Sequence, residues 1–168
     1  MIENSLRPRL VEEAREWIGT PYLHRASCKG QGADCLGLVR GVWRAVLGAE
    51  PATLPAYAPD WAEATRAEQM MEAARRHLVA VAVEDMAPGD VLLFRWRAHL
   101  PAKHAAILVT PARMVHAHDG AAVAEVFLAP WWRRRLAGAF AFPGTQPGSQ
   151  SMSSSRPQRS GEPGSFAG

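Results

Sequence analysis

An aspartate–cysteine pair at the start of an amphipathic segment places the strongest constraint on this chain. Asp34 and Cys35 directly precede apolar residues at helical spacing, and Gly48 follows the last of them. This pattern predicts a helix over residues 35–47, because an aspartate before the first turn accepts the unpaired amide hydrogens there. The positive end of the helix dipole then favours a nucleophilic thiolate at Cys35, without help from another residue. A buried structural cysteine is the alternative interpretation.

Two further segments read as helices. Apolar residues at helical spacing predict a first helix over residues 8–18, with Gly19 at its end. A start that resembles a capping box predicts a third helix over residues 60–78. Within the cysteine helix, Gly37 and Gly41 share one face, which indicates close packing against another backbone.

The second half of the chain has the pattern of strands. Short apolar runs bounded by turn residues predict strands at 91–94, 104–109, 114–118, 122–127 and 137–142. Helices first and hairpin-connected strands afterwards predict an α+β fold with an antiparallel sheet. The basic aromatic run 131–135 interrupts the strands, either as a solvated run or as a docking surface for a partner or polymer.

Composition limits the classes of protein that the chain can belong to. A length of 168 residues suits one domain, and a net charge of +3 suits work near an anionic polymer such as cell wall or nucleic acid. We expect a domain over residues 1–143 and a disordered tail, rich in Ser, Gly, Pro and Arg, over residues 144–168. No apolar run approaches the roughly 20 residues of a membrane helix. The first residues lack the layout of a signal peptide, so we expect synthesis in the cytoplasm without one.

Histidines supply the candidate partners of the cysteine. A thiolate nucleophile needs a base that also protonates the leaving amine, and histidine suits this near neutral pH. His104 opens an apolar strand, whereas His116 and His118 alternate along another strand and point to the same face. With Cys35 these histidines also offer donors for a zinc ion, but the nucleophile chemistry already uses three of them, so no metal and no cofactor is expected. Cys28 is expected to be a free thiol, with a Cys28–Cys35 bridge as the minor alternative.

Five short motifs follow one another along the chain: Gly-Thr-Pro-Tyr at 19–22, Asp-Cys-Leu-Gly-Leu-Val at 34–39, Pro-Gly-Asp-Val-Leu-Leu-Phe at 88–94, Lys-His-Ala-Ala-Ile at 103–107 and Met-Val-His-Ala at 114–117. Their order resembles that of the NlpC/p60 cysteine peptidases, over about residues 10–143. The match is closest to the branch carried by phage tails and gene transfer agents. In that branch Leu-Gly follows the nucleophile, as Leu36-Gly37 does here.

The resemblance implies a papain-like fold, with the cysteine helix packed on an antiparallel sheet. It also implies hydrolysis of peptidoglycan stem peptides, usually at the γ-linked bond of D-glutamate to a diamino acid. By the same resemblance Cys35 is the nucleophile, His104 the base and His116 the residue that orients the base. Tyr22 would assist the oxyanion together with backbone amides at the helix start. Asp34 would face a substrate amine.

The chain departs from the family in two places. The family often has Gly-Gly after the tyrosine motif, whereas this chain has His24-Arg25, which predicts a wider and more cationic cleft entrance. His24, with Arg25 and Lys29, would contact an anionic wall carboxylate there, or else belong to a solvated loop. The insertion at residues 97–101, before His104, is also unusual and affects the leaving-group side.

Three functions compete on this evidence. The first is a cell-wall cysteine endopeptidase at the tip of a phage-like tail, with stem peptides as substrate and tail-hub or baseplate proteins as partners. It would contact no nucleic acid directly and would not insert into a membrane. The second is a structural tail-hub module with little or no activity, and the third is amide or acyl transfer by the same thiolate. The joint presence of Cys35, His104 and His116 favours an enzyme.

Overall fold

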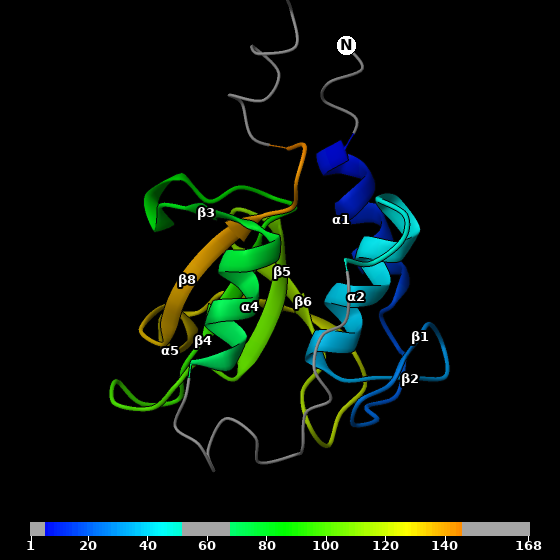
Figure 1. Cartoon of the computed structure of the whole chain (residues 1–168). Helices are drawn as coiled ribbons and strands as arrows, with labels where there is room; N and C mark the ends of the chain where they lie inside the picture. Colours follow the sequence, from blue (N-terminus) through cyan, green and yellow to red (C-terminus); the bar gives the residue numbers. More distant parts are fainter. Residues whose placement is uncertain (1–5, 52–67, 146–168) are drawn as a thin grey trace, which may run out of the picture.

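A six-stranded antiparallel sheet forms the centre of the fold, and helices cover one of its faces (Figure 1). The computed structural model describes residues 6–51 and 68–145. The helices are α1 (Leu6–Glu16), α2 (Cys35–Val46), α4 (Gln69–His77) and the short α5 (Pro130–Arg133). The sheet runs in the order β3 (Val79–Val81), β8 (Leu136–Ala141), β4 (Val91–Phe94), β5 (His104–Thr110), β6 (Arg113–His116), β7 (Ala124–Phe127).

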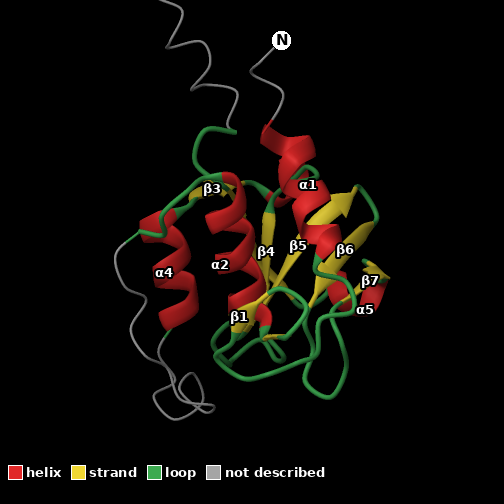
Figure 2. Cartoon of the chain, turned by 90° about the vertical axis from the view of Figure 1, so that its right-hand side faces the viewer, coloured by secondary structure: helices red, strands yellow, loops and turns green. Residues whose placement is uncertain are grey.

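The helices and the sheet enclose the larger of two cores. Helices α1 and α2 pack against β5 and α4 packs against β3, so all three lie on the same side of the sheet (Figure 2). The opposite face of the sheet buries a smaller cluster, against which Trp132 of α5 packs. This arrangement confirms the predicted α+β fold, with the cysteine helix on an antiparallel sheet.

Most predicted elements are present, with shifted ends. Helix α1 runs two residues earlier than expected, whereas α2 begins at Cys35 as predicted. Of the third predicted helix, residues 60–67 lie outside the described residues and α4 forms the rest. Strand β4 is confirmed residue for residue, but β6 ends at His116, so His118 lies beyond it and not on the predicted strand.

Several short elements were not predicted. The run that interrupts the last two strands contains α5, because Pro130 at its first position fixes a helical φ angle. A two-stranded sheet of β1 (Ser27–Cys28) and β2 (Gly32–Ala33) forms between α1 and α2, where no strand was predicted. Strand β3 extends the edge of the main sheet. All of these elements are short, and short elements give little periodic signal.

The two glycines of α2 allow close contacts, as their spacing predicted. A Cβ atom on Gly37 would lie 1.8 Å from the carbonyl oxygen of Ala26, and one on Gly41 would lie 2.0 Å from the ring of Trp17. The predicted contact with backbone is therefore confirmed at Gly37, while Gly41 packs on a side chain instead. The first turn of α2 is consequently held tightly against the loop that precedes it.

The described residues continue to Thr145, two positions past the predicted end of the domain. Thr145 is buried and its hydroxyl donates to the carbonyl of Phe142 at 2.8 Å. The rest of the predicted tail, residues 146–168, lies outside the described residues. Among the helices that the structure describes, none has the length and apolar content to cross a membrane.

Candidate active site

Asp34 fixes the position of Cys35 at the first turn of α2. One carboxylate oxygen accepts the amide hydrogen of Gly37 at 2.7 Å, which confirms the predicted N-cap. The other oxygen accepts the amide hydrogen of Arg25, also at 2.7 Å. A single buried carboxylate thus joins the helix to the preceding loop. Nδ1 of His24 lies 3.8 Å from the same carboxylate. The role of Asp34 toward a substrate amine stays a prediction.

Backbone amides and burial have opposite effects on the pKa of the Cys35 thiol. The amides of Ala105, Leu36 and Cys35 itself donate toward it, which favours a thiolate. Burial, followed by the charge of Asp34, outweighs them and raises the pKa of the thiol to about 12. The prediction that the helix start alone supplies a thiolate is therefore wrong. A base must remove the proton during the attack.

His104 and His116 form a buried pair at the start of β5 and the end of β6. Strand β5 pairs with β6 so that Ala106 faces His116, which brings the two imidazoles to the same face of the sheet. Nε2 of His104 lies 2.9 Å from Nδ1 of His116. The amide of Ala105, which donates to the thiol, belongs to the residue after His104. The structure thus pairs the two predicted histidines and places the thiol against the strand residue that follows His104, while their catalytic roles stay a prediction.

The proton positions that make His104 a base follow from this contact. When Nε2 of His104 donates to Nδ1 of His116, its Nδ1 keeps a free lone pair that can accept the thiol proton. Burial, followed by the neighbouring imidazoles of His116 and His118, holds the pKa of His104 well below 6.5. Burial and His118 lower the pKa of His116 to about 4. At neutral pH the resting site therefore holds a thiol and two neutral imidazoles.

We expect the acidic limb of kcat/KM to lie below pH 6.5, because a histidine with a lowered pKa stays a competent base in mild acid. Stability should change in the same window. The unfolded chain binds protons at these histidines near pH 6.5, whereas the folded chain binds them only at lower pH. Their contribution to stability is thus complete above pH 6.5 and is lost as the pH falls. A pH–rate profile with its acidic midpoint at or above 6.5 would contradict this assignment.

His118 lies at the solvent side of the pair. Its ring centroid is 5.6 Å from that of His104 and 5.7 Å from that of His116, and its Nδ1 contacts the carbonyl of Asp119 at 3.2 Å. It is exposed, unlike the two others. Among the residues that the structure describes, no group of three His, Cys, Asp or Glu side chains is arranged to hold a metal ion.

Tyr22 lies within electrostatic range of Cys35 and Asp34, and its role toward the oxyanion stays a prediction. A bridge between Tyr22 and Ala33 holds its loop against β2. Burial, followed by the charges of Cys35, Asp34 and Asp119, raises the pKa of the phenol to about 12. Tyr22 therefore remains protonated and can donate a hydrogen bond.

Two tryptophans that the sequence analysis did not assign to the site contact the base. Trp96 lies 5.5 Å from His104 with planes 27° apart, and Trp132 lies 5.4 Å away at 26°. Trp132 also meets His116 edge-on at 5.2 Å. Trp96 follows β4, whose Phe94 is paired with His104 of β5. Knowledge of the register between these two predicted strands would therefore have placed Trp96 near the base.

The entrance loop is less cationic than predicted. Lys29 pairs with Glu13 at 2.6 Å and with Glu16 at 2.8 Å, so two carboxylates of α1 neutralise its charge. Lys29 is therefore not placed to hold a wall carboxylate. Arg25 does lie exposed at the entrance. Cys28 and Cys35 are both free thiols.

We expect Arg25→Gly to be more stable than Arg25→Ala by about 1 kcal/mol, measured by chemical denaturation. Arg25 has a φ of 68°, in the left-handed region that costs a residue with a Cβ roughly 1 kcal/mol or more. Both variants lose the arginine side chain, so their difference isolates the backbone. Equal stabilities would show that the loop relaxes and carries no such cost.

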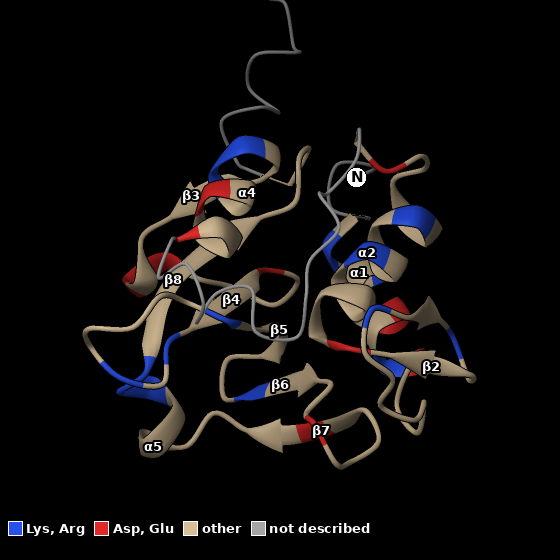
Figure 3. Cartoon of the chain, turned by 60° about the horizontal axis from the view of Figure 1, so that its bottom comes forward, with Lys and Arg blue, Asp and Glu red and all other residues tan. Residues whose placement is uncertain are grey.

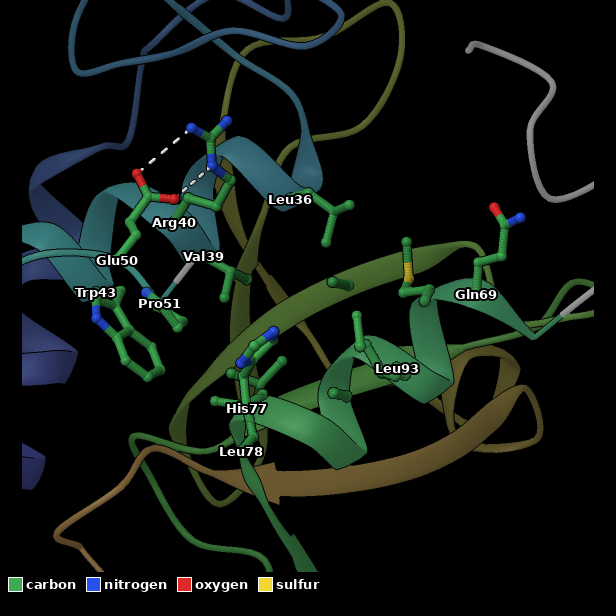
Figure 4. Close-up of a pocket in the computed structure, with 15 residues that line it drawn as sticks. Leu36, Val39, Arg40, Trp43, Glu50, Pro51, Gln69, His77, Leu78 and Leu93 are labelled. Carbon is green, nitrogen blue, oxygen red and sulfur yellow. Dashed lines mark hydrogen bonds and ion pairs between the residues drawn. The ribbon is translucent and has the colours of Figure 1, made fainter. Parts of the chain in front are cut away.

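An apolar pocket of about 110 Å³ lies next to the site, between α2 and α4 (Figure 4). Leu36 and Ala105, which follow Cys35 and His104 in the chain, line it. The nucleophile and the base are not among its lining residues. Arg40 and Glu50, paired at 2.8 Å, form its polar rim. The pocket therefore adjoins the catalytic residues without containing them.

Comparison with known proteins agrees with this geometry. The model of the NlpC/P60 family matches residues 19–140. Gamma-DL-glutamyl hydrolase of Bacillus subtilis (strain 168) is 29% identical over 130 residues, which cover 77% of this chain and 28% of that protein. This chain thus spans little more than a quarter of that relative.

Solved structures share the fold. The NlpC/p60 domain of the peptidoglycan hydrolase SagA superposes with a TM-score of 0.59 at 22% identity, covering 81% of this chain and 98% of that domain. An NlpC/P60 family protein of Bacillus cereus ATCC 10987 gives a TM-score of 0.58 at 22% identity, over 82% of this chain and 41% of that one. At these identities the likeness concerns the fold.

Proposed function

Because the chain belongs to the NlpC/P60 family, we propose that it is a cysteine endopeptidase that hydrolyses peptidoglycan stem peptides at the γ-D-glutamyl bond to the diamino acid. The observation that carries the proposal is the buried His104–His116 pair at 2.9 Å, together with a thiol at a helix start that accepts the amide hydrogen of Ala105, the residue after His104. The name of the Bacillus relative, a hydrolase of γ-glutamyl bonds, supports the choice of bond.

The first half of the reaction begins with a neutral thiol. As the sulfur of Cys35 attacks the carbonyl carbon, Nδ1 of His104 takes the thiol proton. The imidazolium that forms donates from Nε2 to His116, which holds its ring in place. His104 then gives the proton to the leaving amine, and the acyl group stays on the sulfur.

The oxyanion requires donors that the fold has not already used. Among the first amides of α2, that of Gly37 donates to the Asp34 side chain and that of Leu38 to the Asp34 carbonyl. The amides of Cys35 and Leu36 point toward the sulfur, where the oxyanion would form. Together with the Tyr22 hydroxyl they are the donors available to the oxyanion. In the second half His104 activates a water molecule, which releases the acid and restores the thiol.

Incubation of the whole chain with L-Ala-γ-D-Glu-diaminopimelate tests this function. Mass spectrometry should show L-Ala-D-Glu and free diaminopimelate, each increasing with time. Added hydroxylamine distinguishes transfer from hydrolysis, since an acyltransferase would pass the acyl group from the sulfur mainly to hydroxylamine and release a hydroxamate, whereas a hydrolase would release mainly the free acid. An intact peptide after prolonged incubation would instead favour a structural role.

We propose that the enzyme is delivered to the wall as part of a phage-like tail. The support is the Leu36-Gly37 pair after the nucleophile, which is typical of that branch of the family. In the fold Gly37 packs against the Ala26 carbonyl and Leu36 lines the adjoining pocket. Co-sedimentation of the native protein with tail particles, followed by cross-linking to hub or baseplate proteins, tests this. Recovery only as free protein in a lysate that contains such particles would contradict it.

A further inference from the structure

Three tryptophans form a continuous aromatic surface that leads away from the base, here called the tryptophan wall: Trp96, Trp131 and Trp132. Trp96 and Trp132 both contact the ring of His104. Trp131 contacts Trp132 edge-on at 4.9 Å and Trp96 at 6.1 Å. Trp131 is 44% exposed, which is much for so large an apolar side chain. The wall thus starts at the base and ends in solvent.

A cation is fixed at the exposed end of this wall. The guanidinium of Arg135 lies 3.7 Å above the Trp131 ring, and one of its nitrogens donates to the Trp131 carbonyl at 2.9 Å. No acidic side chain pairs with it among residues 6–51 and 68–145. Nearby Arg95, in contrast, is neutralised by Glu68 at 2.6 Å. Figure 3 shows other basic positions gathered at α5 and on the neighbouring loop between β4 and β5.

The chemistry of the site decides which part of a substrate meets this wall. A base that protonates the leaving amine must lie within hydrogen-bond reach of that nitrogen. The residue that carries the amine therefore starts at His104. Because the wall begins on the same imidazole and runs outward to solvent, it offers a surface on which that residue can lie.

We propose that the tryptophan wall and Arg135 form the subsite for the leaving residue, and that Arg135 selects leaving residues with a free carboxylate. The inference rests on the proposed function and adds its specificity. A planar guanidinium binds a carboxylate through two parallel hydrogen bonds, and the indole ring beneath it keeps its fork in a fixed orientation. Diaminopimelate in a wall peptide carries such a carboxylate, and so does each unit of a γ-linked glutamate polymer.

Matched peptides test the subsite. The pair is L-Ala-γ-D-Glu-diaminopimelate with free carboxylates and the same peptide with both diaminopimelate carboxylates amidated. The wild type should cleave the acid form about tenfold better in kcat/KM, mainly through KM, as one charge-assisted contact at a partly exposed site predicts. Arg135→Gln should lose the preference, because its kcat/KM on the acid form falls by about tenfold, to the level of the amidated form. Equal cleavage of both peptides by the wild type would overturn the proposal.

Variants separate the subsite from general charge effects. Arg9→Gln removes the same charge from an exposed position on α1 and should keep the full preference. Arg135→Lys retains the charge without the planar fork and should keep part of the preference for the acid form. An intermediate preference in Arg135→Lys would show that the loss in Arg135→Gln is not caused by a folding defect. A preference that persists in Arg135→Gln, or that Arg9→Gln loses equally, would overturn the proposal.

Two further measurements distinguish this inference from the proposed function. Calorimetric binding of both peptides to Cys35→Ala should show the same tenfold difference in Kd, even if no peptide is hydrolysed. Weak binding of the acid and amide forms alike would count against the subsite. A γ-linked glutamate oligomer forms the other arm. Its cleavage, with the same loss in Arg135→Gln and no cleavage of wall peptides, would support the subsite and overturn the wall substrate.

Discussion

Cys35→Ala should reduce hydrolysis of the stem peptide by four orders of magnitude or more, because removal of a nucleophile leaves only binding and oxyanion stabilisation, with effects of roughly 10⁴-fold or greater. The fold should remain. Asp34, not the sulfur, caps α2 through the amide of Gly37. The thiol is neutral at rest, so its loss removes no charge. We therefore expect the free energy of unfolding to change by less than about 1 kcal/mol.

The second cysteine provides a matched control. Cys28 is an exposed free thiol in β1, and Cys28→Ala should keep wild-type kcat/KM. Alkylation before the assay should inactivate the wild type and Cys28→Ala equally, because both keep Cys35. Near wild-type digestion of purified wall by Cys35→Ala would rule out the cysteine mechanism.

His104→Ala should abolish activity and His116→Ala should lower kcat by about 10²–10³-fold, since an orienting residue fixes a tautomer and moves no proton. His116→Asn should regain about tenfold, because its amide oxygen can accept the Nε2 hydrogen of His104. His118→Ala should have a mild effect. Its ring lies near the pair, but the hydrogen bond it makes is to the Asp119 carbonyl.

The three alanine variants are matched, because each removes one imidazole ring. Steady-state kinetics on one peptide, together with thermal unfolding of each variant, separates a catalytic loss from a folding defect. A tolerated His116→Ala beside a His118→Ala as inactive as His104→Ala would transfer the orienting role to His118. Loss of wild-type activity in a chelator would instead support the metal alternative.

The sequence was sufficient for the elements whose signals are local. An N-cap aspartate and a glycine beyond the last turn marked α2, and four consecutive apolar residues marked β4. Strand alternation was less reliable for the histidines. It placed His118 on the strand of His116, yet the strand ends at His116 and the chain turns. The order of motifs, not periodicity, chose His116, and the contact with His104 agrees with that choice.

Features set by tertiary packing could not be predicted. Helix position argued for a thiolate, but the burial of Cys35 depends on how α2 meets β5, which no local pattern shows. The contact of Trp132 with the base likewise requires α5 to fold back on the far face of the sheet. Lys29 looked available to a ligand because its partners, Glu13 and Glu16, are distant in sequence.

The two hydrogen bonds of the Asp34 carboxylate have a consequence for the way the cleft is built. One bond holds the start of the nucleophile's helix and the other holds the loop of Arg25, so a single side chain joins the helix to the entrance loop. The histidines belong to a different unit, the sheet. The alignment of the Cys35 thiol with the histidines therefore depends on how α2 packs on the sheet. Substitutions where α2 packs on β5 should therefore lower the rate without changing any reacting group.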